Sequence, residues 1–286
     1  MTVPGSVGEL TETLRRGSYL ADRGLATAVH VALSLRRPLL LEGEVGVGKT
    51  EIAKVLANVL GRSLIRLQCY EGIDTSQALY EWDYSRQLLY IRTLSSEVPV
   101  TELFGPEFLL ERPLLSAVRA GDRAVLLIDE VDRADDEFEA FLLEVLSDFQ
   151  ISIPEIGTVA AESPPLVILT SNRTRELHDA LKRRCMYHWI DYPPAEREVE
   201  IVLMREPSVS EALARKVVAA VTRLRALDLA KPPGVAETID WARTLDFLGE
   251  TVLSPEVASV TLGAVVKERD DLELVRESLG EIAPDA

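Results

Sequence analysis

The chain has 286 residues and a formal net charge of −16, and 47% of its residues are hydrophobic. This length suits one large domain with a smaller one, and the hydrophobic content allows a substantial core. The acidity argues against a non-specific nucleic-acid binder, which usually carries an excess of Lys and Arg. We predict a cytoplasmic location, because we see neither an apolar run of membrane-spanning length nor a signal peptide.

Helices are expected first, over residues 5–36, in two pieces broken near Gly17 and Ser18. His30 falls on or near the apolar face of the second piece, and we assign it no role. Cys69 and Cys185 lie in separate apolar runs and do not have the spacing of a metal site. We expect both to be reduced core residues.

The stretch from Gly43 to Thr50 has the spacing G-x-x-x-x-G-K-[ST] of a phosphate-binding P-loop. An apolar run precedes it and apolar residues at helical spacing follow it, so it lies between a buried strand and a helix N-terminus. Backbone N–H groups and the helix dipole favour phosphate there. Lys49 is expected to neutralise the β- and γ-phosphates of ATP, and Thr50 to place its hydroxyl on Mg²⁺. The predicted nucleotide-binding residues are Gly43, Glu44, Val45, Gly46, Val47, Gly48, Lys49, Thr50 and Glu51.

Four aromatic residues lie between Tyr70 and Tyr84, in a chain that is only 6% aromatic. A strand is expected before them, over residues 63–69, and a short strand after them, over 88–91. Two interpretations of the aromatic segment stay open. We favour packing of a local hairpin against the core over a contact surface for a polypeptide partner.

A helix over residues 107–120 leads into the apolar run 124–128, which ends in Asp129 and Glu130. The run suits a strand buried on both faces of a parallel sheet. Ligands bind at the carboxyl ends of such strands. We therefore predict that Asp129 holds Mg²⁺ through water and that Glu130 orients and polarises the attacking water.

Five acidic residues between Asp132 and Glu139 precede a helical apolar pattern, and we interpret them as a solvated helix start. A small hairpin over 150–159 and a buried strand over 166–172 come next. That strand ends in Asn172, which is placed to hydrogen-bond the attacking water or the γ-phosphate. A short helix over 179–184 and a last strand over 186–190 complete an alternation of strands and helices that predicts a parallel α/β sheet.

The rest of the chain is expected to be helical, with helices over 193–205, 210–228, 235–249, 255–268 and 271–280. We predict a nucleotide-binding domain over residues 1–206, with a parallel sheet flanked by helices. A small all-α lid domain is predicted over 207–286.

The chain resembles AAA+ ATPases over nearly its whole length. The resemblance rests on a P-loop, an Asp-Glu strand, an Asn-ended strand and an Arg pair, which occur in this order. Within that group the chain looks like the MoxR branch and is most similar to the CoxD-like proteins. The first of the segments that carry the resemblance is shared by many P-loop proteins, and the others are more specific. These segments are 46–54, 66–72, 180–185 and 231–238.

The resemblance implies roles for single residues. Asp129 and Glu130 would form Walker B, Asn172 would be sensor 1, and the hairpin would be the insertion before the sensor-1 strand. Arg184 matches the arginine finger, which usually precedes an aromatic residue. Because Cys185 follows it here, Arg183 stays an alternative. The sensor-2 Arg usually lies near the start of the third lid helix. Residues 234–238 contain no Arg, and Arg243 is a turn or more away.

The resemblance also implies a ring-forming ATP-hydrolysing chaperone, usually hexameric. Such proteins work with von Willebrand factor A-domain proteins to mature client metalloenzymes, including molybdenum hydroxylases of the carbon monoxide dehydrogenase type. Two alternatives are a P-loop small-molecule kinase and a DNA-remodelling AAA+ ATPase. The helical domain and the Arg pair favour the chaperone over the kinase, and the acidic charge weighs against DNA.

Overall fold

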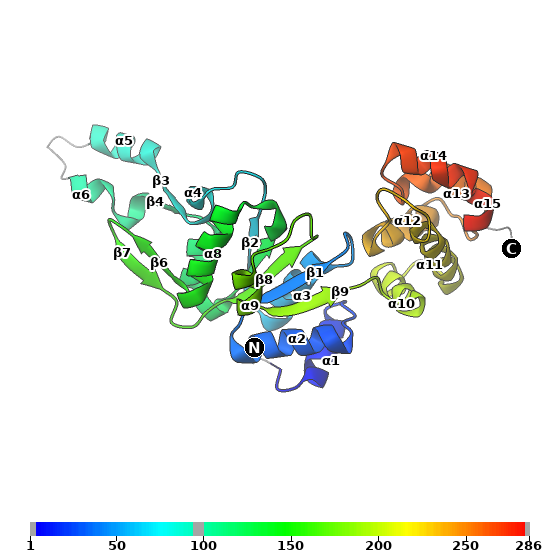
Figure 1. Cartoon of the computed structure of the whole chain (residues 1–286), viewed down its shortest axis with the longest axis horizontal. Coiled ribbons are helices and arrows are strands. Elements are labelled where there is room, and N and C mark those ends of the chain that lie inside the picture. The colour runs from blue at the N-terminus through cyan, green and yellow to red at the C-terminus, as the bar shows by residue number, and fades with distance from the viewer. Residues whose placement is uncertain (1–3, 94–99, 284–286) are drawn as a thin grey trace. The chain divides into compact units, whose positions relative to one another are not determined.

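The computed structural model describes residues 4–93 and 100–283, and its contacts divide the chain into two compact units (Figure 1). The second unit consists of Ser18–Leu20, Gly43–Lys49 and the chain from Ile190 onward, and the first holds the remainder. The predicted domain boundary at 206/207 stays a prediction. Within the described ranges, no helix is long and apolar enough to cross a membrane.

A five-stranded parallel sheet forms the centre of the first unit, as the alternation of strands and helices predicted. Its three inner strands are buried along their whole length, which explains their largely apolar sequences. In spatial order the strands are β2 (Ser63–Gln68), β5 (Ala124–Asp129), β8 (Leu166–Ser171), β1 (Leu39–Gly43) and β9 (Met186–Ile190).

The first two helices begin where polar side chains cap their first N–H groups. Ser6 accepts from the N–H of Glu9, and Asp22 accepts from the N–H of Leu25, so the predicted helical region breaks between these two caps. The longer helices of this unit are α1 (Val7–Arg16), α2 (Arg23–Leu35), α3 (Lys49–Leu60), α5 (Tyr84–Thr93), α7 (Pro113–Ala120) and α8 (Asp136–Asp148), with the short α9 (Asp179–Arg184) near its end.

The strand predicted over residues 88–91 is wrong, because these residues belong to helix α5 (Tyr84–Thr93). The carboxylate of Asp83 accepts a hydrogen bond from the N–H of Arg86 at 2.9 Å, which satisfies one of the free donors at the start of the helix. A short apolar run therefore does not indicate a strand when a capping residue earlier in the chain starts a helix that includes it.

The helix predicted over 107–120 is shorter than expected and starts at Pro113. A 3₁₀ turn (Pro106–Phe108) and strand β4 (Leu109–Glu111) occupy the first part of that range. Proline fits the first turn of a helix and pushes the residue before it into an extended conformation, so Arg112 cannot continue a helix.

Two antiparallel ribbons extend this unit. In one, β4 pairs with β3 (Tyr80–Trp82), and the other joins β6 (Gln150–Ile153) to β7 (Gly157–Ala160) at the predicted hairpin. Figure 1 shows both toward the same end of the unit, where α5 lies far from the sheet. Trp82 is buried and makes edge-to-face contacts with Tyr80 and Phe104, which agrees with the packing interpretation. Tyr70 and Tyr84 are exposed, so the contact-surface alternative stays open for them.

The second unit has a helical core centred on Trp241, which is fully buried. Helix α10 (Ala195–Arg205) contributes Val199 and Val202 to this core, together with residues of the helices that follow it. The helices of this unit are α10 (Ala195–Arg205), α11 (Glu211–Arg225), α12 (Val235–Phe247), α13 (Pro255–Thr261), α14 (Arg269–Glu277) and α15 (Leu279–Ile282).

A buried ion pair ties three of these segments together. Both oxygens of the fully buried Glu198 accept from Arg225, at 2.7 and 2.8 Å, and Thr238 also donates to Glu198 at 2.6 Å. Arg225→Ala would leave this carboxylate buried and uncompensated. We expect the free energy of unfolding to fall by about 3–5 kcal/mol in urea denaturation.

The matched control for this prediction is Arg215→Ala. Arg215 pairs with the exposed Glu196 and Glu211, so its removal should change stability by less than about 1 kcal/mol. Equal losses in the two variants would show that burial of Glu198 is not the source of the effect.

Candidate functional site

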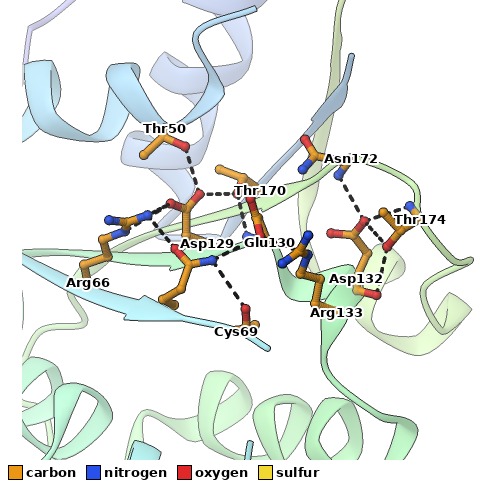
Figure 2. Close-up of polar contacts among 11 residues, drawn as sticks. Thr50, Arg66, Cys69, Asp129, Glu130, Asp132, Arg133, Thr170, Asn172 and Thr174 are labelled. Carbon is orange, nitrogen blue, oxygen red and sulfur yellow. Dashed lines mark hydrogen bonds and ion pairs between the residues drawn. The ribbon is translucent and has the colours of Figure 1, made fainter. Parts of the chain in front are cut away.

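Asp129 ends strand β5 with a carboxylate that accepts hydrogen bonds on both oxygens (Figure 2). Its Oδ1 accepts from the hydroxyl of Thr50, the last residue of the P-loop motif, at 2.9 Å and from that of Thr170 at 2.6 Å. Its Oδ2 accepts from Nη2 and Nε of Arg66, at 2.6 and 3.1 Å. The side chain is 4% exposed, so these donors fix its orientation.

Glu130 follows with a left-handed backbone, φ 55° and ψ 50°, which is uncommon for a residue with a side chain. Its N–H donates to the hydroxyl of Thr170 at 2.9 Å. Its carboxylate Oε2 accepts from Nε2 of Gln68 at 3.2 Å and pairs with Nε of Arg133 at 3.1 Å. Such backbone strain persists where surrounding contacts impose it, and it is concentrated at functional sites.

Arg66 and Gln68 are contacts of the two acids that the sequence did not assign. Alternate residues of a strand point to the same face, and Gln68 of β2 pairs in register with Asp129 of β5. Arg66 therefore reaches Asp129, while Gln68 reaches Glu130, and the guanidinium of Arg66 also donates to Gln68. The available signal was two polar residues, two positions apart, toward the end of a largely apolar strand.

The acidic cluster after Glu130 only partly fits the predicted solvated helix start. Asp135 caps α8 by accepting from the N–H of Phe138 at 2.8 Å, as expected for such a start. Asp132 is instead 2% exposed, and its Oδ2 accepts from the N–H groups of Asn172 and Thr174, at 3.2 and 2.8 Å. The prediction was wrong for Asp132, because the turn between β5 and α8 directs this side chain toward the loop after β8. It was also wrong for Glu139, which is 1% exposed and accepts from the N–H of His178 at 2.9 Å.

Asn172 and the Arg pair are positioned by two different elements, the strand β8 and the helix α9. Asn172 directly follows β8, and its side-chain amide makes no hydrogen bond within the described residues. Arg183 and Arg184 end α9 and are exposed, and in the same ranges neither guanidinium is hydrogen-bonded or ion-paired. The side chain of Arg37 donates to the carbonyls of Arg183 and Arg184, at 2.7 and 3.1 Å, and so holds the helix end that carries them.

The P-loop residues before Thr50 pack within the second unit. Lys49 is buried, and its Nζ donates to the carbonyl of Gly43 at 2.7 Å. The carbonyl of Gly46 accepts from the N–H of Val235 at 3.0 Å, in the first turn of α12. Glu237 occupies that turn and accepts from the N–H of Gly234. Glu237 therefore places a carboxylate in the turn for which the resemblance implies a sensor-2 Arg.

Cys69 and Cys185 are buried free thiols. Burial is the main cause that raises the pKa of each thiol to about 12, so both stay protonated at neutral pH. A buried protonated thiol is a poor nucleophile, which agrees with the prediction of two reduced core residues.

The donor set around Asp129 fits Mg²⁺. This ion takes oxygen ligands, and it usually keeps several waters and binds through one or two carboxylates together with phosphates. Asp129 and Thr50 bring a carboxylate and a hydroxyl within 2.9 Å of each other. In the described part of the chain no group of three or more His, Cys, Asp or Glu side chains is placed to hold a metal, so a dedicated protein cage is not present there.

The family model described as "AAA domain (dynein-related subfamily)" matches residues 38–185, which is more than half of the chain. The chain therefore belongs to this family of AAA ATPases. The matched range includes the whole P-loop motif and the Asp129–Glu130 pair. A nucleotide-binding AAA+ domain, as predicted from the sequence, is confirmed at the level of the family.

Two relatives and one solved structure show how far this similarity extends. The chain is 27% identical to "Protein CbbQ" of Hydrogenophilus thermoluteolus, over 77% of this chain and 76% of that protein. It is 26% identical to "Protein NorQ" of Paracoccus denitrificans, over 64% of this chain and 63% of that protein. The fold resembles a mutant of RuvB from Thermotoga maritima with a TM-score of 0.53 and 18% identity, covering 98% of this chain and 79% of that one. The last match supports the fold alone.

Proposed function

We propose that this protein is an ATP-hydrolysing AAA+ chaperone of the MoxR type, which acts as a ring of identical chains. The observation that carries the proposal is the contact between Thr50 and Asp129, with Glu130 adjacent to it. It links the last residue of the P-loop motif to Asp129 at the end of an inner strand, next to Glu130, which is an arrangement that supports phosphoryl transfer to water.

In this proposal Thr50 would place its hydroxyl on Mg²⁺ and Asp129 would hold the ion through water, and the ion would neutralise part of the negative charge of the phosphates. Glu130 accepts a proton from the attacking water. Gln68 and Arg133 hold its carboxylate in place. Asn172 hydrogen-bonds the water or the γ-phosphate through its unengaged amide. Arg184, or Arg183 in its place, supplies positive charge from a neighbouring chain.

Lys49→Ala is expected to weaken ATP binding about 10- to 100-fold, because the phosphates lose a charge-assisted hydrogen bond. Titration with a fluorescent ATP analogue measures the change. Lys267→Ala is the matched control, since it removes an equal charge from an exposed Lys that donates only to the carbonyls of Gly263 and Ala264. Equal affinities of wild type and Lys49→Ala would remove Lys49 from the site.

The main alternative is a P-loop kinase that acts as a single chain. A ring whose sites are completed by neighbouring chains should show ATPase activity per chain that rises with protein concentration. A kinase should show activity per chain that does not depend on concentration. The exposed guanidiniums of Arg183 and Arg184, which have no partner among the described residues, favour the ring.

The client and partners follow from the resemblance to the CoxD-like branch. We propose a hexameric ring that works with a von Willebrand factor A-domain protein. Its client would be a metalloenzyme, and the resemblance favours a molybdenum hydroxylase of the carbon monoxide dehydrogenase type. We place these proteins in the cytoplasm, and we expect no nucleic-acid partner because the net charge is −16. Proteins that co-purify with Glu130→Gln, compared with those that co-purify with Lys49→Ala, test this assignment.

A further inference from the structure

Arg66 places a positive charge directly on the carboxylate that is proposed to hold Mg²⁺. Two of its nitrogens lie 2.6 and 3.1 Å from Oδ2 of Asp129 (Figure 2). Its side chain is 51% exposed, whereas that of Asp129 is 4% exposed. The guanidinium thus covers the solvent side of a buried anion, and any metal ion bound by Asp129 has this cation as a close neighbour.

Arg66 is not the only group that orients Asp129. The hydroxyls of Thr50 and Thr170 already fix Oδ1, at 2.9 and 2.6 Å. Both hydroxyls belong to regular elements, since Thr50 lies in the first turn of α3 and Thr170 lies in β8. The remaining effect of Arg66 is electrostatic, because an adjacent positive charge weakens the binding of another cation to the same carboxylate.

The negative charge of the neighbouring acid, Glu130, is also balanced by an Arg. Glu130 pairs with Arg133 at 3.1 Å, so two guanidiniums face two carboxylates. Without Arg66, two adjacent acids and a hydroxyl would present a net negative oxygen-rich site to any free divalent cation. With Arg66 in place, the site favours a second cation only when bound phosphates add their own negative charge.

We propose that Arg66 is a resident counter-cation of Asp129 that makes divalent metal binding depend on bound nucleotide phosphates. This inference rests on the proposed Mg²⁺–nucleotide site. In this inference Arg66 acts through its charge on Asp129 and does not contact the reacting atoms. Its consequence is ordered loading, in which metal enters together with the phosphates and not before them.

The test is Mn²⁺ binding, with Mn²⁺ as the probe for Mg²⁺ and free Mn²⁺ measured by electron paramagnetic resonance. The wild-type protein should bind Mn²⁺ weakly alone and more tightly with ADP. Arg66→Gln should bind Mn²⁺ alone about fivefold more tightly than wild type, the size expected from a half-exposed ion pair. Because ADP is not hydrolysed, the readout is independent of turnover.

Three further variants decide the cause. Arg66→Lys keeps the charge and should bind Mn²⁺ like wild type. Arg119→Gln removes an equal charge from the partly exposed pair with Glu111 and should also bind like wild type. The gain in Arg66→Gln should disappear in the double variant with Asp129→Asn.

Unchanged or weaker Mn²⁺ binding in Arg66→Gln, with a folded protein by circular dichroism, would overturn the proposal. A gain in Arg66→Lys equal to that in Arg66→Gln would also overturn it, because the charge would not be the cause. Failure of the wild-type protein to bind Mn²⁺ and ADP together would instead reject the proposed nucleotide site. The two failures are therefore distinguishable.

Discussion

Arg184→Ala is expected to lower ATP turnover by about 10³- to 10⁵-fold, the range found for a lost arginine finger. The guanidinium of Arg184 is exposed at the end of α9, and Arg37 holds the carbonyl of the same residue at 3.1 Å. An Arg that is held at a helix end, with a guanidinium unengaged by the described residues, is available to a second chain. Steady-state ATPase assays measure the loss, with ATP binding measured alongside it.

A mixing experiment tests whether the finger acts between chains. One face of a heterologous ring contact would carry Glu130 and the other face Arg184. Arg184→Ala and Glu130→Gln should each be nearly inactive alone, and dissociating and reassembling them together should restore activity. Random mixing makes the intact pairing about one quarter of all interfaces in such a ring.

Arg183→Ala is the matched control, since it removes the same charge one residue earlier. A dead Arg183→Ala beside a fully active Arg184→Ala would move the finger to Arg183. A monomer that turns over ATP without either Arg would reject the ring mechanism and favour the kinase.

Glu130→Gln is expected to bind ATP normally and to lose turnover by roughly 10²- to 10⁴-fold, the usual contribution of a general base. Glutamine keeps the size of the side chain but cannot accept a proton from water. The decisive measurement compares ATP binding with ATP turnover. It is made by analogue titration and phosphate release on the same sample.

Asp136→Asn is a suitable control for Glu130→Gln. It removes an equal charge from the start of α8, where the carboxylate is 74% exposed. Its turnover should stay near that of wild type. Turnover near wild type in Glu130→Gln as well would exclude Glu130 as the base, and the neighbouring carboxylates would have to be tested in turn.

The five strands of the main sheet, the P-loop and most helices could be predicted from the sequence because local spacing specifies them. A glycine-rich stretch between an apolar run and a 3.6-residue periodicity has few alternatives. Two errors came from the same local reasoning. Residues 88–91 form part of α5 because Asp83 caps that helix, and Pro113 delays the start of α7. In both cases one capping or helix-starting residue outweighed an apolar pattern.

The environment of the acids was decided by tertiary structure. The sequence placed Asp129 and Glu130 at the end of a buried strand, and the chain folds that way. It did not show that Arg66 and Gln68 would reach them, because this depends on the register of β2 against β5. Strand pairing aligns residues about 60 positions apart in the sequence, and a shift of one residue would turn both side chains to the opposite face.

The same distinction applies to Asp132 and the Arg pair. By sequence Asp132 belonged to a solvated acidic run, yet packing of the β8 loop buries it against the N–H groups of Asn172 and Thr174. Arg183 and Arg184 were recognised from the sequence. The contact of Arg37 with their carbonyls was not, because Arg37 lies 147 positions before Arg184 in the chain. Local spacing determined which elements form and which residues are candidates. Long-range pairing determined the charges around each candidate, because electrostatic contacts depend on distance in space and not on separation along the chain.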